Sequence, residues 1–271
     1  MVEYDELGCV GTSVYPDAPG HLFNEILPRL IHMDTVLPVH VPLLWPPGSL
    51  PQRVLASLRA SGLISKERLF IDTVLSGETL YRAKRLYVYA SDYTSGHTPL
   101  ILATSQRVLA SRLQLLAERS PLSPGLPSLH HGGIVLLLRR PSDARFVENG
   151  ALLIDALRKQ HPGVFIDDFV PGSEGRSYVE VASRVYGARV VIGPHGANMN
   201  NFIAARAGSW VVEVGYSDQE NPLPSDYFCQ ARNLGLRYWL SMADYGSYGG
   251  AIRVNIDDIL EITKRAFSGK E

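Results

Sequence analysis

Residues 190–215 read VVIGPHGANMNNFIAARAGSWVVEVG, and this stretch decides the fold class. VVIG (190–193) and WVVEV (210–214) are short, rich in β-branched residues and nearly free of charge, which is typical of strands buried in a parallel sheet. The segment between them, residues 195–208, is long enough for one helix. The stretch therefore predicts a strand, a helix and a second parallel strand.

The turn after the first of these strands is rich in glycine. Gly193 and Gly196 permit a tight turn into a helix, and Gly208 is a plausible helix stop. Free amides at a helix N-terminus attract anions, and ligands of open α/β sheets bind at the carboxyl ends of the strands. We therefore expect a phosphate or diphosphate at this turn, in contact with His195, Gly196, Ala197 and Asn198. A histidine in a turn can also be purely structural, but its place in HGAN at a strand end favours ligand contact.

The second half of the chain alternates between strand and helix patterns, which predicts a doubly wound parallel sheet. The expected strands are 133–138, 164–169, 190–193, 210–214 and 237–240, and the expected helices are 149–160, 177–186, 195–208, 224–235 and 257–267. Asn255 precedes the last helix as a plausible N-cap.

The first half shows a less regular α/β order. We expect strands at 40–45, 68–72 and 84–90 and helices at 49–63 and 99–117. Residues 120–132 are rich in Pro, Ser and Gly, which predicts a linker. The chain is thus expected to form two Rossmann-like domains, residues 1–122 and 133–271.

Three groups of motifs resemble glycosyltransferase family 61, the DUF563 group. HGANMNNFIAARAGSWVVEV is similar to the family's HGAGLTN…F…PG…VVE signature, and the family's Y…LA…G…Y tail follows it. LLLRRPSDARFVEN resembles an R…R…N segment, and HLFNEILPRL resembles NY.H…D.LPRL. The matched residues outside the turn are His21, Glu25, Arg140, Arg145, Asn149, Tyr227, Ala231, Gly235 and Tyr238.

The resemblance implies a GT-B-like fold, in which two Rossmann-like domains face a cleft. The C-terminal half would hold the donor nucleotide and the N-terminal half would meet the acceptor. It also implies an inverting transfer from a UDP-sugar, with xylose and N-acetylglucosamine as the leading candidates, to a glycan or glycoprotein acceptor.

Inverting transfer needs a base for the acceptor hydroxyl and stabilisation of the departing diphosphate. Glu25 is the candidate base, because His21 lies one helical turn away and could orient or tune its carboxylate. This pair matches the family's His and Asp positions. The alternative is that Glu25 is a solvated helix carboxylate and His21 an N-terminal helix residue.

Arginines that follow the strand 133–138 are candidates to bind the diphosphate, because a guanidinium donates two parallel hydrogen bonds to phosphate oxygens. Arg140 and Arg145 have the family's spacing, together with Asn149, whereas Arg139 is expected to be surface charge. Glu213, at the end of WVVEV, is expected either to accept ribose hydroxyls or to pair with a nearby arginine.

Composition excludes several classes of function. The formal net charge is −1, from 26 basic and 27 acidic residues, so the chain has no general basic field for nucleic acid or an anionic membrane. Two distant cysteines are too few for a disulfide scaffold or a structural zinc site, and we expect both thiols to be buried and free. No apolar run is long enough to span a membrane, and the acidic MVEYDELG is unlike a signal peptide, so a cytoplasmic location is expected.

The sequence contains no G.S.G elbow, P-loop or G.G..G fingerprint, which disfavours a hydrolase, an NTPase and a dehydrogenase. Asp167 and Asp168 are neighbours on a strand and point to opposite faces, so they predict no metal site. We expect an enzyme without metal or other cofactor, with the UDP-sugar as co-substrate. Two alternatives are a non-catalytic nucleotide-sugar-binding protein and another Rossmann-type phosphate-handling enzyme, such as a phosphatase with His195 as nucleophile.

Overall fold

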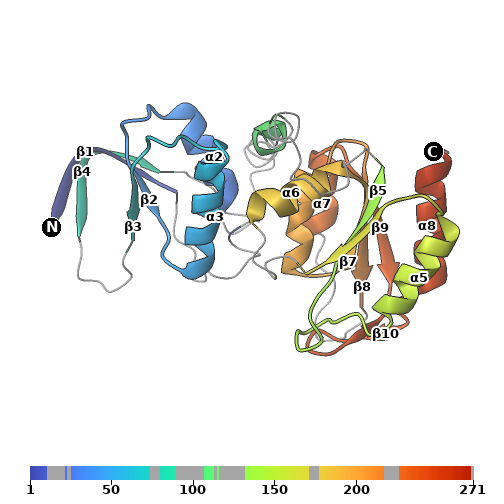
Figure 1. The fold of residues 1–271 in the computed structure, drawn as a ribbon. Helices are drawn as coiled ribbons and strands as arrows, with labels where there is room; N and C mark the ends of the chain where they lie inside the picture. Colours follow the sequence, from blue (N-terminus) through green and yellow to red (C-terminus); the bar gives the residue numbers. More distant parts are fainter. Residues whose placement is uncertain are drawn as a thin grey trace. The chain divides into compact units, whose positions relative to one another are not determined.

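The computed structural model describes residues 1–10, 22, 26–73, 80–88, 107–112, 115, 132–170, 177–216 and 226–269. Contacts within the chain divide it into two compact units (Figure 1). The N-terminal unit comprises Met1–Leu116 with Ser177–Val179, and the C-terminal unit comprises Ala117–Arg176 with Glu180–Glu271. The predicted linker, residues 120–132, lies outside the described residues except for Gly132.

The C-terminal unit contains a five-stranded sheet in which every neighbouring pair is parallel. Its strands are β5 (Gly133–Leu137), β6 (Ile166–Phe169), β7 (Ala188–Pro194), β8 (Trp210–Gly215) and β9 (Arg237–Met242). Their order in the sheet is β6-β5-β7-β8-β9, so the chain moves to one side of β5 for β6 and to the other side for β7. This is the doubly wound order in which ligands bind between the first and third strands.

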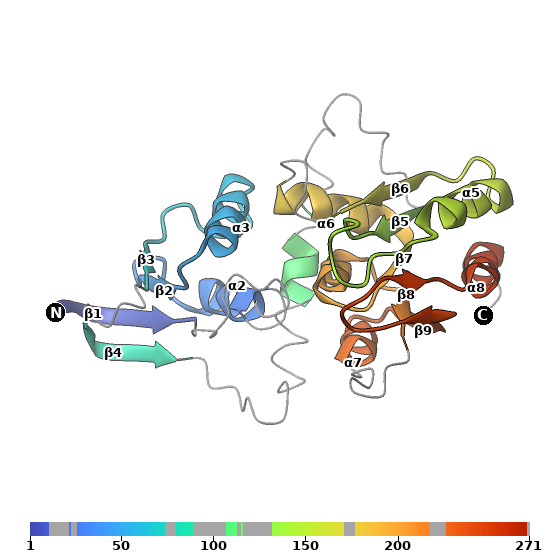
Figure 2. The same ribbon diagram turned by 90° about the horizontal axis from the view of Figure 1, so that it is seen from below.

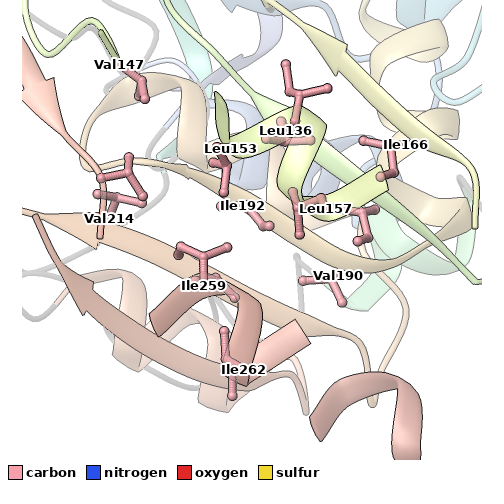
Figure 3. Close-up of a cluster of buried hydrophobic side chains, with 14 of the residues drawn as sticks. Leu136, Val147, Leu153, Leu157, Ile166, Val190, Ile192, Val214, Ile259 and Ile262 are labelled. Carbon is pink, nitrogen blue, oxygen red and sulfur yellow. The ribbon is translucent and has the colours of Figure 1, made fainter. Parts of the chain in front are cut away.

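Helices cover both faces of this sheet. They are α5 (Gly150–Gln160), α6 (Tyr178–Gly187), α7 (Asp226–Asn233) and α8 (Ile256–Ser268). Figures 1 and 2 show α5 and α8 on one face and α6 and α7 on the other. Side chains along a strand alternate between the two faces of the sheet. Leu136 on β5 and Ile192 on β7 belong to the buried hydrophobic cluster that also contains residues of α5 and α8 (Figure 3). The α/β class expected from the alternating pattern is confirmed.

The expected helix after β7 is a 3₁₀-helix, η3 (Ala197–Ala204). Two asparagine side chains bond back three residues: Asn200 Nδ2 donates to the Ala197 carbonyl at 3.1 Å and Asn201 Nδ2 to the Asn198 carbonyl at 2.8 Å. These local bonds favour the tighter three-residue turn. As expected, Asn255 caps α8, because its Oδ1 accepts the backbone N–H of Asp258 at 3.0 Å.

The N-terminal unit contains a four-stranded parallel sheet of order β3-β2-β1-β4. Its strands are β1 (Val2–Cys9), β2 (Leu43–Trp45), β3 (Phe70–Asp72) and β4 (Tyr81–Val88), and its helices are α2 (Leu27–Val36) and α3 (Ser49–Ala60). This order matches the first four strands of a Rossmann sheet. Of the expected helix 99–117, the described residues 107–112 and 115 are helical.

Strand β1 lies inside the sheet, although its acidic sequence did not predict a strand. Its acidic side chains pair with basic ones on β4, at 2.7 Å for Asp5–Lys84 and 2.6 Å for Glu6–Arg85. The first half of β1 and most of β4 are exposed, so these pairs form a charged surface instead of a core.

A buried ion pair stabilises the other end of the N-terminal unit. The Arg68 side chain is 1% exposed, and its Nε donates to Asp34 Oδ1 at 2.9 Å. Its two Nη atoms donate to four backbone carbonyls, those of Asp34, Leu37, Pro38 and Val41. All the polar groups of this arginine are therefore bonded.

Cys9 and Cys229 are both free, as expected, but neither is fully buried: Cys9 is half-buried and Cys229 is exposed. Among the helices that the structure describes, none has both the length and the apolar character required to cross a membrane.

Candidate functional site

The candidate site lies in the C-terminal unit, where the chain switches sides of the sheet. β5 ends at Leu137 and its neighbour β7 ends at Pro194, so the segments that follow them leave the same edge. The first segment carries Arg139 and Arg145, and the second carries His195 and Gly196. Polar groups from two distant parts of the sequence thus meet at the position where doubly wound sheets bind ligands.

Gly196 brings the backbone of the turn against two guanidinium groups. Its φ of 134° and ψ of −176° lie in a region that only glycine adopts readily. A Cβ at this position would lie 2.2 Å from Arg139 Nη2 and 3.2 Å from Arg145 Cζ. Both arginines therefore reach the turn that the sequence predicts to bind phosphate.

Among the described residues no carboxylate forms an ion pair with either of these arginines, although the charge of the nearby Asp143 acts on Arg139. Arg139 Nη1 donates to the Ala144 carbonyl at 3.0 Å, but the Nε atoms of both arginines are buried without a hydrogen-bond partner in the described ranges. Burial lowers the pKa of Arg139, and the like charge of Arg145 lowers it further. A pair of partly desolvated cations with unused donors favours an anion.

The segment after β9 supports Arg145. The short strands β10 (Tyr245–Gly246) and β11 (Ile252–Arg253) are antiparallel, and the residues between them contact the arginine. The Arg145 backbone N–H donates to the Gly250 carbonyl at 2.6 Å, and its guanidinium lies 4.7 Å from the centre of the Tyr248 ring. Arg145 has a φ of 63°, so its backbone is in the left-handed region. Its position is thus held from a third part of the chain.

His195 forms a hydrogen-bonded chain with the buried Glu213 and the half-buried Tyr238. Its Nδ1 contacts Glu213 Oε1 on β8, and Glu213 Oε2 accepts the Tyr238 hydroxyl of β9 at 2.5 Å. The Glu213 side chain is 1% exposed. Burial, and then the bond to Glu213, raise the pKa of Tyr238, so this hydroxyl stays protonated and donates. The described residues give His195 Nε2 no hydrogen-bond partner.

Aromatic rings flank the histidine. The centres of the Tyr216 and Tyr227 rings lie 5.9 and 5.4 Å from that of His195. The Tyr227 hydroxyl also donates to the Gly196 carbonyl at 2.8 Å. Tyr227 and Tyr238, the two tyrosines of the tail motif, therefore both support the turn.

Three of the predicted site residues, Arg140, Glu213 and Asn149, form contacts within the protein. Arg140 points to solvent, with 66% of its side chain exposed, and pairs with Asp143 at 3.4 Å. The expectation that Arg139 is surface charge is wrong, because this arginine is the one that reaches Gly196. Neighbours in an extended segment point in opposite directions, which separates the two.

Glu213 is 1% exposed, and its two oxygens contact His195 and Tyr238; within the described residues no arginine pairs with it, so the arginine pair named as the alternative is not found there. Asn149 is 5% exposed, and its side chain forms two hydrogen bonds with the backbone of Val254, at 2.8 and 2.9 Å. It braces the β5–α5 connection.

The remaining predicted residues are distributed as follows. Ala197 begins η3, and Asn198 Nδ2 donates to the Leu138 carbonyl at 2.9 Å, which ties the turn to the end of β5. His21 and Glu25, the predicted catalytic pair, lie outside the described residues. In the described ranges, no three His, Cys, Asp or Glu side chains gather as a metal site would need.

Sequence reasoning missed Arg139, Tyr238 as the partner of Glu213, and Tyr248. The doublet Arg139–Arg140 signalled that one of two neighbours faces the site, but its spacing did not decide which. Tyr238 was recognised as a motif residue without a role. For Tyr248 the sequence carried no usable signal.

Comparison with known proteins identifies the family. The model for Glycosyltransferase 61 matches residues 20–212. No curated protein matches the chain. Among solved structures, the E. coli heptosyltransferase WaaC with ADP-2-deoxy-2-fluoro heptose is similar, with a TM-score of 0.43 and 10% identity over 98% of this chain and 99% of that one.

A mutant flavo di-iron protein from Thermotoga maritima has a TM-score of 0.35 and 10% identity, over 92% of this chain and 52% of its own. Both scores are below 0.5, so neither likeness bears on function. The family match spans well over half of the 271 residues and includes both arginines, His195 and Gly196. The chain therefore belongs to the glycosyltransferase 61 family.

Proposed function

We propose that this glycosyltransferase takes a sugar from a UDP-sugar and transfers it with inversion to a glycan or glycoprotein acceptor, without a metal ion. Xylose and N-acetylglucosamine are the leading candidates for the sugar. The observation that carries the proposal is the pair of arginines at Gly196, whose buried Nε donors have no partner among the described residues.

A diphosphate matches this pair in charge and in hydrogen bonding. Its oxygens accept the forked donors of Arg139 and Arg145, and the amides at the start of η3 add a positive dipole end. Departure of the nucleotide leaves negative charge on the phosphate nearest the sugar. Two fixed guanidinium groups would stabilise that charge, which is the role that a divalent cation has in other transferases.

Binding experiments test the diphosphate site directly. Calorimetry should detect UDP, whereas uridine, which lacks the diphosphate, should bind at least about tenfold more weakly, because hydrogen bonds to charged groups contribute about 1.5–3 kcal/mol each. Equal affinity for UDP and uridine would contradict the site. A UDP-dependent rise of the melting temperature is a second readout, because a ligand that binds only the folded state stabilises it.

Turnover experiments test the enzyme. Release of UDP from UDP-xylose or UDP-N-acetylglucosamine, to water or to a glycan, should continue in excess EDTA. Loss of turnover in EDTA with recovery on added manganese would refute metal independence. UDP binding without any turnover would instead favour a nucleotide-sugar-binding protein.

The base is tested separately, because Glu25 lies outside the described residues. Glu25→Gln keeps the size of the side chain and removes its basicity. If Glu25 accepts the acceptor proton, this variant should lose about 100-fold or more in transfer while its UDP affinity is unchanged. Transfer within a few-fold of the wild type would assign the base elsewhere.

A further inference from the structure

We propose that Glu213 and Tyr238 are positioning residues that keep His195 doubly protonated, so that Nε2 donates a proton to the departing phosphate. The inference rests on the proposed function for its substrate. The hydrogen-bonded chain of His195, Glu213 and Tyr238 spans three successive segments of the C-terminal unit, and it places a buried carboxylate behind the histidine.

Glu213 is buried in an apolar part of β8. Its neighbours on β8, Val212 and Val214, are buried apolar residues, and Glu213 itself is 1% exposed. A buried carboxylate is strongly disfavoured unless a cation or several hydrogen bonds compensate it. Among the described residues, the group that contacts Glu213 and is able to become a cation is His195, and Tyr238 supplies a neutral hydrogen bond. Charge balance therefore favours the imidazolium form of His195.

One nitrogen of the His195 ring is bonded to Glu213, and within the described residues the other is available. Nδ1 donates to Glu213, so the second ring nitrogen, Nε2, is left for another partner. In the neutral ring with Nδ1 protonated, Nε2 can only accept a hydrogen bond; in the imidazolium it donates. Tyr238 holds the second oxygen of Glu213, which fixes the carboxylate and with it the plane of the imidazole.

The surroundings of the ring are consistent with a bound anion. Among the described residues, the ionisable groups that face it are Glu213 on β8, Tyr216 directly after β8 and Tyr227 on α7. On the β5–α5 connection, Arg139 and Arg145 lie against the adjacent Gly196. Their positive charge opposes a protonated His195 when the site is empty, and a diphosphate that neutralises the arginines removes this opposition.

The transfer step balances as follows. The bond between the sugar C1 and the phosphate oxygen breaks, and its electron pair stays on that oxygen, which takes the proton from Nε2. The acceptor hydroxyl oxygen forms the new bond to C1, and its proton passes to the catalytic base. After UDP leaves, neutral His195 regains a proton from water. Nδ1 and Glu213 keep their hydrogen bond throughout.

Two substitutions separate this role from a purely structural one. Glu213→Gln removes the buried charge at nearly constant volume, and Tyr238→Phe removes one hydrogen bond but keeps the ring. The matched control is Tyr245→Phe, because Tyr245 also donates to a glutamate, Glu148, but on the surface. All variants are first compared with the wild type by thermal unfolding.

We expect all three variants still to bind UDP, because both arginines and the turn remain, and we expect the loss of the imidazolium charge in Glu213→Gln to lower UDP affinity by less than it lowers turnover. UDP release from UDP-xylose or UDP-N-acetylglucosamine should fall at least about tenfold in Tyr238→Phe and about 100-fold in Glu213→Gln, as a loss in kcat and not in KM. Tyr245→Phe should match the wild type. Unchanged turnover in both Glu213→Gln and Tyr238→Phe, with UDP still bound, would overturn the inference.

Nitrogen NMR of the histidine rings gives a readout that needs no substrate. The chain has 8 histidines, and the His195 signals are assigned as those lost in His195→Asn. With the diphosphate site filled by UDP or, if UDP does not bind, by inorganic pyrophosphate, both ring nitrogens of His195 should be protonated at pH 7 in the wild type and only one in Glu213→Gln. A neutral His195 ring in the wild type would also overturn the inference. Failure of UDP to bind would refute the proposed donor and not this inference. The NMR result with pyrophosphate would still report on the protonation of His195 beside Glu213.

Discussion

Two adjacent arginines provide the sharpest test of the site. Arg139→Ala and Arg140→Ala remove the same charge from neighbouring positions, so any general electrostatic effect on a nucleotide is closely similar. The structure distinguishes the two residues, because Arg139 reaches Gly196 whereas Arg140 is 66% exposed and pairs with Asp143. We expect Arg139→Ala to weaken UDP binding strongly and Arg140→Ala to have little effect.

The magnitude follows from the contacts. A hydrogen bond to a charged group contributes about 1.5–3 kcal/mol, or about 10- to 100-fold in affinity. Loss of Arg139 also relieves its repulsion from Arg145, which lowers the pKa of Arg139 in the wild type, so the lower half of that range is expected, about 10- to 30-fold. An exposed ion pair such as Arg140–Asp143 contributes about 0–1 kcal/mol. The UDP affinity of Arg140→Ala should therefore stay within about fivefold of that of the wild type.

The assay is titration calorimetry with UDP at 0.15 M salt, with uridine as the ligand that lacks phosphates. The difference between the variants should vanish for uridine. A larger loss of UDP affinity in Arg140→Ala than in Arg139→Ala would refute the placement of the diphosphate at Gly196 and would restore the assignment made from motif spacing.

Three further substitutions test the geometry. Gly196→Ala should cost about 1–3 kcal/mol of stability, because alanine is strained at this backbone conformation. The added methyl group should also displace Arg139, so that UDP binds less tightly in calorimetry. Unchanged UDP affinity would mean that Arg139 does not need to lie against Gly196 to bind the diphosphate. Arg68→Ala should lower the free energy of unfolding in urea by about 1–3 kcal/mol, because it leaves buried backbone carbonyls without their donor while Arg112 still pairs with Asp34 at 3.1 Å, and no measurable loss would contradict that reasoning. Asn255→Ala removes the cap of α8 and should cost about 1 kcal/mol in the same measurement, whereas no change would show that the cap bond contributes nothing.

Much of the C-terminal unit could be predicted from the sequence, because buried parallel strands appear as uninterrupted apolar runs. GIVLL became β5 and WVVEV became β8 with boundaries close to those expected. Strand β1 was missed for the converse reason. Its charges are compensated by β4, which lies more than 70 residues later, and no local pattern records that pairing.

The site was predicted at the level of the turn but not of the individual contacts. HGAN at a strand end indicated where an anion would bind, since glycine content and strand position are local properties. The partner of a buried carboxylate is not local: Glu213 meets Tyr238 only because β8 and β9 are neighbours in register. Likewise, the choice between Arg139 and Arg140 depends on how the segment after β5 turns towards Gly196.

The exposed charges of the N-terminal sheet have a consequence for association between molecules. Strand β4 is the last strand of the described sheet, and within the described residues no strand pairs with its outer edge, which a similar strand could join. Arg82, Lys84 and Arg85 all lie on it, whereas the acidic side chains that balance them lie on β1. If the β4 strands of two molecules paired side by side, three cations of one strand would lie close to three cations of the other. This repulsion disfavours a continuous sheet that extends from one molecule into the next.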